Sequence, residues 1–275
     1  ESLDDWDDPS HSDGRHGTHI GGTLACSFVD GTNASEGTSL TYAAKLVVQD
    51  IVDESGWVPP DVDWLLWEGL SQGAVIHSDS WGDDTTQYTA RTYDFDAWSS
   101  EVPWSVAFIA PGNNGGQMME PANARSVVAV GVSTKSEEGG LYQWSSVGEA
   151  HDGRRGIHIT TPGVGIVSAK ADGIHDSMNN GTRSSTGSSM ATPTAASFTA
   201  IIQQLVEEGY FSNGTGFTPS GPLLRALLAL AAEPIPDLLH NQGTTGMGPD
   251  NIQGWGRANL SRLVNFTNLS DSNVW

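Results

Sequence analysis

The sequence predicts a doubly wound α/β fold, in which helices cover both faces of a mainly parallel sheet. Short and almost wholly apolar segments at 106–110 and 126–132 suit strands that are buried on both faces. Segments with helical spacing alternate with such strands along the chain, as they do in α/β proteins. The length of 275 residues suits one large domain with a substantial core. We therefore expect a single domain over 1–275, with its site at the carboxyl ends of the strands.

The first helix is expected from Gly17 to Val29. Its apolar residues recur at a four-residue spacing, at Ile20, Leu24 and Phe28. Glycines disfavour a helix by propensity, and this segment contains three of them: Gly17, Gly21 and Gly22. We infer that another part of the chain approaches this backbone closely.

The later elements follow from the same two patterns. Strands are expected at 44–49, 74–77, 106–110 and 126–132, and helices at 61–72, 87–99, 190–207 and 221–232. The opening stretch 1–14 is polar and rich in aspartate, so we expect a loop there. The tail beyond Asn259 is weakly patterned.

The composition excludes several classes of protein. The chain has 12 Lys and Arg against 33 Asp and Glu, a formal net charge of −21, which argues against binding nucleic acid. No apolar run approaches the roughly 18 to 20 residues of a membrane span. The single cysteine, Cys26, excludes an internal disulfide framework and a multi-thiolate metal site, and we expect it to be buried packing.

The strongest chemical signal is the segment Gly187 to Pro193, where Ser188 and Ser189 stand at the start of a long apolar helix. A serine on a glycine turn at a helix N-terminus has an exposed hydroxyl close to unpaired backbone N–H groups. Those donors and the positive helix end suit a developing oxyanion. Taken alone, the segment fits an ordinary serine N-cap equally well.

The second signal is His16-Gly17-Thr18-His19. A histidine is the usual base that activates a serine. The alternatives are a buried structural histidine, or a metal pair formed by His16 and His19 with His11 as a third ligand. The HExxH pattern of many zinc enzymes is absent.

The third signal is Asn113, which follows the apolar strand 106–110 within a glycine-rich segment. A side-chain amide at the carboxyl end of a parallel strand is well placed to donate to a negative oxygen. Asn-Gly is also common turn chemistry. A phosphate-binding loop fits less well, because neither GxGxxG nor a Walker lysine is present.

Together these segments resemble the subtilisin-like serine proteases in order and rough spacing. The resemblance extends to Ser80-Trp81-Gly82, similar to the segment that lines the substrate cleft in that family. It also includes Pro162-Gly163 and Gly254-Trp255-Gly256-Arg257, so it covers nearly the whole chain. It implies the subtilisin-like α/β fold and a serine endopeptidase.

The resemblance also implies roles for individual residues. Ser189 would be the nucleophile, His16 the general base and acid, and Asn113 the side-chain donor of the oxyanion hole, together with the N–H of Ser189. The residues expected to line the substrate cleft are Ser80, Trp81, Gly82 and Gly112.

The triad aspartate is the one departure from the family pattern. The family carries it in an Asp-Ser/Thr-Gly turn after a strand that precedes the histidine. Only fifteen residues precede His16 here, so we expect this chain to lack an N-terminal segment. That stretch shows no strand pattern, and we assign none of its aspartates to the triad: Asp4, Asp5, Asp7, Asp8 and Asp13. Loss of the strand would expose Val47, Val48, Phe108 and Ile109.

Three functions are therefore considered. The first is a secreted endopeptidase that acts on polypeptides, with its own pro-segment as a further partner. The second is a catalytically impaired relative that binds peptides, and the third is a serine esterase. The expected chemistry needs no cofactor. The resemblance implies that structural calcium can be bound, but the spacing of residues in the sequence does not identify its ligands. We expect broad specificity, with large apolar residues favoured before the scissile bond.

Overall fold

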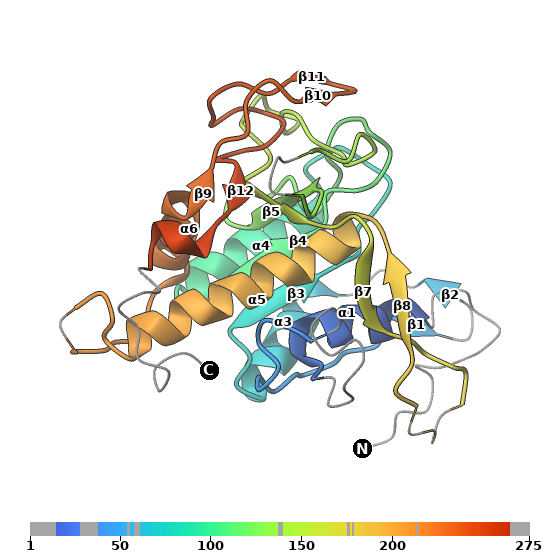
Figure 1. Ribbon diagram of the computed structural model, residues 1–275. Helices are drawn as coiled ribbons and strands as arrows, with labels where there is room; N and C mark the ends of the chain where they lie inside the picture. The colour runs from blue at the N-terminus through green and yellow to red at the C-terminus, as the bar shows by residue number, and fades with distance from the viewer. Residues whose placement is uncertain are drawn as a thin grey trace.

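The computed structural model describes residues 15–27, 38–53, 56–57, 61–136, 140–174, 177, 179–212 and 214–264. Its centre is a six-stranded sheet in the order β3-β4-β5-β6-β12-β9 (Figure 1). These strands are β3 (Ile76–Asp79), β4 (Val106–Ile109), β5 (Val128–Ser133), β6 (Ile159–Pro162), β12 (Arg257–Ala258) and β9 (Ala232–Glu233). All neighbours are parallel except β9 and β12. The predicted doubly wound fold is confirmed.

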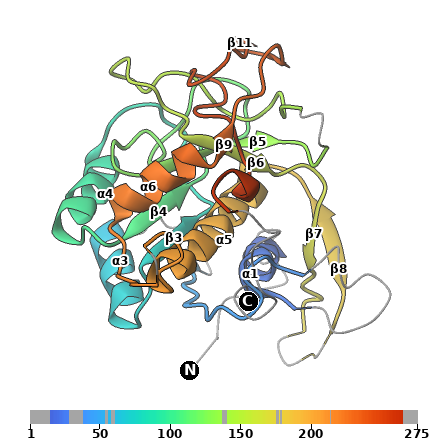
Figure 2. The same ribbon diagram turned by 60° about the vertical axis from the view of Figure 1, so that its left-hand side comes forward.

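Helices cover the two faces of this sheet, as Figure 2 shows. They are α1 (His16–Ala25), α3 (Val62–Ser71), α4 (Ala90–Glu101), α5 (Ser188–Glu207) and α6 (Gly221–Leu230). On β4, Ala107 and Ile109 pack in the cluster with α3 and α4, while Val106 and Phe108 pack with α5 and α6. This alternation shows that β4 is buried on both sides, as its apolar run predicts. Among the described helices, none is both long and apolar enough to cross a membrane.

Three short antiparallel hairpins lie outside the central sheet. They are β1 (Val52–Asp53) with β2 (Gly56–Trp57), β7 (Ile166–Ala169) with β8 (Thr182–Ser185), and β10 (Leu239–His240) with β11 (Gly243–Thr244). The β7–β8 hairpin packs beside α1 (Figure 1). The glycines of α1 predict that another part of the chain approaches this helix closely, and strand β7 does so. A Cβ on Gly22 would lie 2.5 Å from Ser168 Oγ, whereas one on Gly17 would meet nothing within 4 Å.

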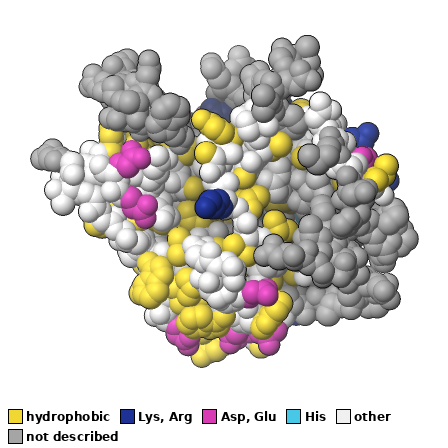
Figure 3. Space-filling model, turned by 90° about the horizontal axis from the view of Figure 1, so that it is seen from below, with side chains coloured by type: hydrophobic (Ala, Val, Ile, Leu, Met, Phe, Trp, Pro, Cys, Tyr) yellow, Lys and Arg dark blue, Asp and Glu magenta, His cyan; other side chains and the backbone are white. Residues whose placement is uncertain are grey.

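The prediction of a strand at 44–49 is wrong. The segment forms no strand within the described chain, and Leu46, Val47 and Val48 are 40%, 39% and 72% exposed. Residues of both 44–51 and 73–82 line a cavity of about 850 Å³. Strand β3 is one of the two edge strands of the central sheet. Hydrophobic side chains gather on the lower face of the molecule (Figure 3).

The expected exposure of Phe108 and Ile109 is also wrong, because β4 lies between β3 and β5 and both side chains are fully buried. Cys26, just beyond α1, is a half-buried free thiol rather than a core side chain. Burial raises its pKa, which disfavours the reactive thiolate.

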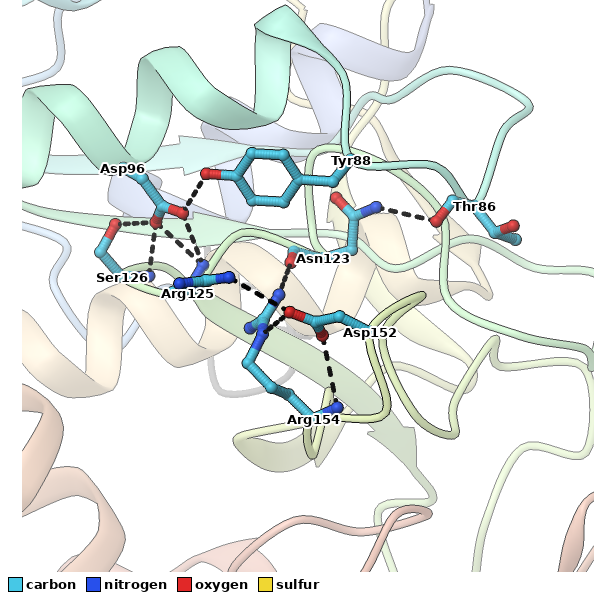
Figure 4. Close-up of polar contacts among 8 residues, drawn as sticks. All are labelled: Thr86, Tyr88, Asp96, Asn123, Arg125, Ser126, Asp152 and Arg154. Carbon is cyan, nitrogen blue, oxygen red and sulfur yellow. Dashed lines mark hydrogen bonds and ion pairs between the residues drawn. The ribbon is translucent and has the colours of Figure 1, made fainter.

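A polar network holds the loop that leads into β5, at the end of the sheet opposite the strand carboxyl ends (Figure 4). The Asp96 carboxylate accepts hydrogen bonds from the Tyr88 hydroxyl at 2.6 Å and from the Ser126 N–H at 2.8 Å. Burial opposes ionisation of Asp96, but these bonds prevail and lower its pKa. Burial and the neighbouring Asp96 raise the pKa of Tyr88 to about 12. Asp152 pairs with Arg125 and Arg154 beside it.

Candidate active site

Ser189, the predicted nucleophile, lies in the first turn of α5, at the start of the long helix that the sequence predicts. Gly187 caps the helix with φ 154°, and a Cβ there would lie 3.2 Å from Asn113 Oδ1. The first N–H groups of an α-helix have no partner within the helix. The turn therefore brings a half-buried serine hydroxyl close to backbone donors, as an oxyanion site requires.

Ser80 is joined to Ser189 by two hydrogen bonds. The Ser189 hydroxyl donates to the Ser80 carbonyl at 3.4 Å, and the Ser80 hydroxyl donates to the Ser189 carbonyl at 3.0 Å. In a regular helix the Ser189 carbonyl would accept from the N–H four residues on, but that residue is Pro193, which has none. The proline thus leaves an acceptor for Ser80.

Asn113 follows β4 at its carboxyl end and reaches the start of α5. Its Oδ1 accepts a hydrogen bond from the Ser188 N–H at 2.8 Å, while the residue as a whole is exposed. Because Oδ1 is bound to the helix, the amide nitrogen Nδ2 of the same side chain can donate a hydrogen bond to a ligand. The structure therefore places the Asn113 side chain at the N-terminus of the helix that carries Ser189.

His16 is the first residue of α1 and is half-buried. It lines the cavity of about 850 Å³ together with Ser80, the residue that binds Ser189. Helix α1 packs against α5, which carries Ser189. The structure thus places His16 on a helix that packs against α5, in a cavity whose lining includes the partner of Ser189, Ser80.

The metal interpretation of His16 and His19 finds no support in the described residues. The carbonyl oxygens of Ile166 and Arg183 lie within hydrogen-bond distance of His19 Nε2, at 3.1 and 3.2 Å. Burial lowers the pKa of the His19 imidazole. Within the described ranges, no three His, Cys, Asp or Glu side chains are arranged to hold a metal ion. His11 and the five aspartates of the first fifteen residues lie outside the described residues.

The predicted cleft residues Trp81 and Gly82 continue from β3. The Trp81 indole N–H donates to Asp79 Oδ1 at 3.0 Å, and the Arg91 guanidinium lies over the ring at 5.9 Å. A Cβ on Gly82 would lie 2.5 Å from the Glu120 carbonyl oxygen. The segment is therefore held from both sides, which suits a fixed edge against which a substrate can lie.

Sequence reasoning missed two buried ionisable residues on β3, His77 and Asp79. Burial raises the pKa of Asp79 to about 7, although the bond from Trp81 opposes the shift. Burial lowers the pKa of His77 to about 4. The predicted strand 74–77 already includes His77, but the apolar run ends at Ile76, and no hydrophobic signal extends the strand to Asp79.

Comparisons with known proteins show which proteins this chain resembles. The family model described as "Subtilase family" matches residues 2–256. The serine protease/ABC transporter B family protein tagD of Dictyostelium discoideum is 24% identical, over 94% of this chain and 20% of its own length. An extracellular protease of Xanthomonas campestris pv. campestris is 27% identical, over 83% and 38%, and subtilisin NAT of Bacillus subtilis subsp. natto is 29% identical, over 70% and 47%. The chain thus spans from about a fifth to under half the length of these relatives.

Solved structures share the fold. Sphericase aligns with a TM-score of 0.68 and 21% identity, covering 90% of this chain and 77% of its own. The self-cleaved protease domain of PatA aligns with a TM-score of 0.66 and 22% identity, covering 90% and 81%. At these identities the likeness concerns the fold alone.

Proposed function

The chain belongs to the subtilase family of serine peptidases, and from this premise we propose that it hydrolyses peptide bonds through an acyl-enzyme on Ser189. The observation that carries the proposal is the position of Ser189 on the first turn of α5, between Ser80 and Asn113. Three segments that are far apart in the sequence meet at this end of the helix. A serine hydroxyl beside backbone donors and a side-chain amide suits acyl transfer.

In the proposed reaction, His16 removes the proton from Ser189 Oγ as that oxygen attacks the scissile carbonyl carbon. The carbonyl oxygen becomes negative and accepts hydrogen bonds from Asn113 Nδ2 and from the Ser189 N–H. His16 then gives its proton to the leaving amine. Water, activated by the same histidine, hydrolyses the ester on Ser189 and restores the enzyme.

The proposed substrates are polypeptides that lie extended along Ser80-Trp81-Gly82 and bind through their backbone. Nearby acidic side chains have other partners: Asp79 binds Trp81, Asp83 pairs with Arg91, and the Glu120 carboxylate accepts from Thr92. These pairings support a preference for apolar rather than basic side chains before the scissile bond.

Secretion is proposed as well, because an extracellular protease and a subtilisin are among the relatives. A pro-segment partner and structural calcium remain proposals from the family alone.

The test is to incubate the chain with casein and, separately, with a small ester, and to sequence the products by mass spectrometry. New peptide termini, absent when Ser189 is replaced by alanine, support the endopeptidase. Ester hydrolysis with intact casein would identify an esterase instead. Peptide binding without either reaction would identify the binding module.

A further inference from the structure

Asp79 places a carboxylate on the face of β3 that packs with α3 and α4. It pairs in parallel register with Ile109, so the two side chains point to the same face of the sheet, and both are buried. Phe95, Trp98 and Ile109 belong to one hydrophobic cluster on that face. Burying a carboxylate among apolar side chains costs stability unless the group has a partner. The partner of this carboxylate therefore explains its presence.

The partner is the indole of Trp81, two residues along the chain. In an extended segment, residues two apart point to the same side, so Trp81 follows Asp79 toward α4. The Trp81 Nε1–H donates to Asp79 Oδ1 at 3.0 Å, and the indole packs against Phe95 with ring centroids 6.2 Å apart. The other carboxylate oxygen, Oδ2, is buried without a hydrogen-bond partner among the described residues. What the carboxylate holds is thus the Trp81 side chain.

Ser80, which lies between these two residues, points to the opposite face of the sheet. Its hydroxyl donates to the Ser189 carbonyl of α5 at 3.0 Å. Consecutive side chains of the segment are therefore anchored on opposite faces, Ser80 by the helix that carries the proposed nucleophile and Trp81 by Asp79. The two anchors together fix the backbone that joins them.

The carboxylate of Asp79 is not needed to hold β3 in the sheet. Strand β3 pairs with β4 over its whole length, and the Ala110 N–H donates to the Asp79 carbonyl at 3.0 Å. These are interactions of the backbone, which any residue except proline can make. Replacing the Asp79 side chain therefore leaves the strand pairing in place and removes the anchor of Trp81.

We propose that Asp79 is a positioning residue for the peptidase reaction: by binding Trp81 it fixes the backbone of Ser80-Trp81-Gly82, along which an extended substrate lies. The proposal rests on the proposed function, because it takes that segment as the substrate-binding edge. A peptide that binds an edge through its backbone needs the N–H and C=O groups of the edge at fixed positions. Loss of that order places the scissile bond less precisely and slows the reaction. A small ester does not reach the edge and is unaffected.

The test compares kcat/KM for a tetrapeptide p-nitroanilide with kcat/KM for p-nitrophenyl acetate in each variant. Asp79→Leu removes the acceptor and keeps a side chain of similar size, so the peptide-to-ester ratio should fall about five- to tenfold, the scale of one hydrogen bond. Trp81→Phe removes the donor and keeps an aromatic ring, and the ratio should fall by a similar factor. Asp79→Asn keeps an oxygen for the indole N–H, so the ratio should stay close to that of wild type.

Combining Asp79→Leu with Trp81→Phe tests whether the two residues act as one unit. The double variant should show no larger fall in the ratio than either single variant, whereas two losses that multiply would overturn the proposal. Ser105→Ala is the matched control. The Ser105 hydroxyl accepts from the Trp98 indole N–H at 3.1 Å, and Ser105 directly precedes β4, at the end of the sheet opposite Asp79. This variant should lower the free energy of unfolding and leave the ratio unchanged.

Urea unfolding of every variant separates stability from positioning. If Ser105→Ala lowers the ratio as much as Asp79→Leu does, the effect is a general loosening of the fold and the proposal is wrong. An equal loss of both activities in Asp79→Leu and Trp81→Phe, or no loss in either, also overturns it. If Asp79→Leu does not fold, Trp81→Phe and Asp79→Asn still test the same bond. A wild-type chain that hydrolyses neither substrate, or the ester alone, would refute the proposed function itself, and this proposal with it.

Discussion

The hydroxyl of Ser80 donates to the carbonyl oxygen of Ser189 at 3.0 Å, across 109 residues of sequence. That carbonyl is available because Pro193 has no N–H to offer it. The segment directly after strand β3 and the helix α5 are thereby fixed to each other beside Ser189, the proposed nucleophile. A proline that weakens the helix locally thus contributes to the position of the site.

The nucleophile can be tested against its immediate neighbour. Ser189→Ala should abolish covalent labelling by a fluorophosphonate, because the reacting oxygen is removed. Ser188→Ala should leave labelling intact: the Ser188 side chain is fully buried and its hydroxyl has no hydrogen-bond partner in the structure. Mass spectrometry of the labelled peptide gives the result. A label that persists in Ser189→Ala, or that is lost in Ser188→Ala, contradicts the assignment.

The oxyanion role of Asn113 can be separated from its structural role. Asn113→Asp keeps an oxygen for the Ser188 N–H but loses the amide donor, so kcat should fall while KM changes little. Removing such a donor costs about 10²- to 10³-fold in kcat, a scale known from subtilisin itself, a member of this family. An unchanged kcat would make Asn113 a turn residue only.

Asn114→Asp is the control for that variant. The Asn114 Oδ1 accepts from the Ser146 hydroxyl and the Gly116 N–H, both at 2.8 Å, so the aspartate retains these contacts. Its effect on kcat should be far smaller than that of Asn113→Asp.

The parts of the fold that were predictable have a strong local signal. The buried strand β4 and the helices α3, α5 and α6 show their periodicity directly, and Ser189 stands in a distinctive glycine-serine turn. Strand β6 was missed because its residues, Ile159 to Pro162, resemble a loop. Only tertiary contacts make it a strand: the Thr161 hydroxyl, for example, donates to the Ala191 carbonyl at 2.7 Å. Conversely, 44–49 has strand propensity but no strand beside it in the described chain, and propensity without a pairing partner does not make a sheet.

The packing of α1 predicts different outcomes for two similar substitutions. Gly22→Ala should destabilise the fold by about 1–3 kcal/mol, because the new methyl group would overlap Ser168 and Ala169 of β7. Gly17→Ala meets nothing and should be neutral or stabilising by up to about 1 kcal/mol through helix propensity. Urea unfolding of both variants measures the difference. Equal effects would mean that β7 does not constrain α1.

The final prediction concerns the pH dependence of stability that arises from His77 and Asp79, which lie on the same face of β3. Between about pH 4 and 6.5 the folded protein keeps Asp79 protonated while the unfolded chain does not, so this group makes stability fall as pH rises. His77 is neutral in the folded protein over the same range and protonated in the unfolded chain, so it makes stability rise with pH. The two slopes oppose each other, and their sum in the wild type is close to zero.

Asp79→Asn removes the falling slope. The free energy of unfolding of this variant, relative to wild type, should therefore increase by roughly 1.4 kcal/mol for each unit that the pH rises across this window. His77→Gln should decrease relative to wild type by a similar amount. Urea unfolding at pH 4.5, 5.5 and 6.5 provides the measurement, with the exposed Asp84→Asn as a control for simple loss of a negative charge. Parallel pH profiles for Asp79→Asn and Asp84→Asn would show that burial of Asp79 does not govern its titration.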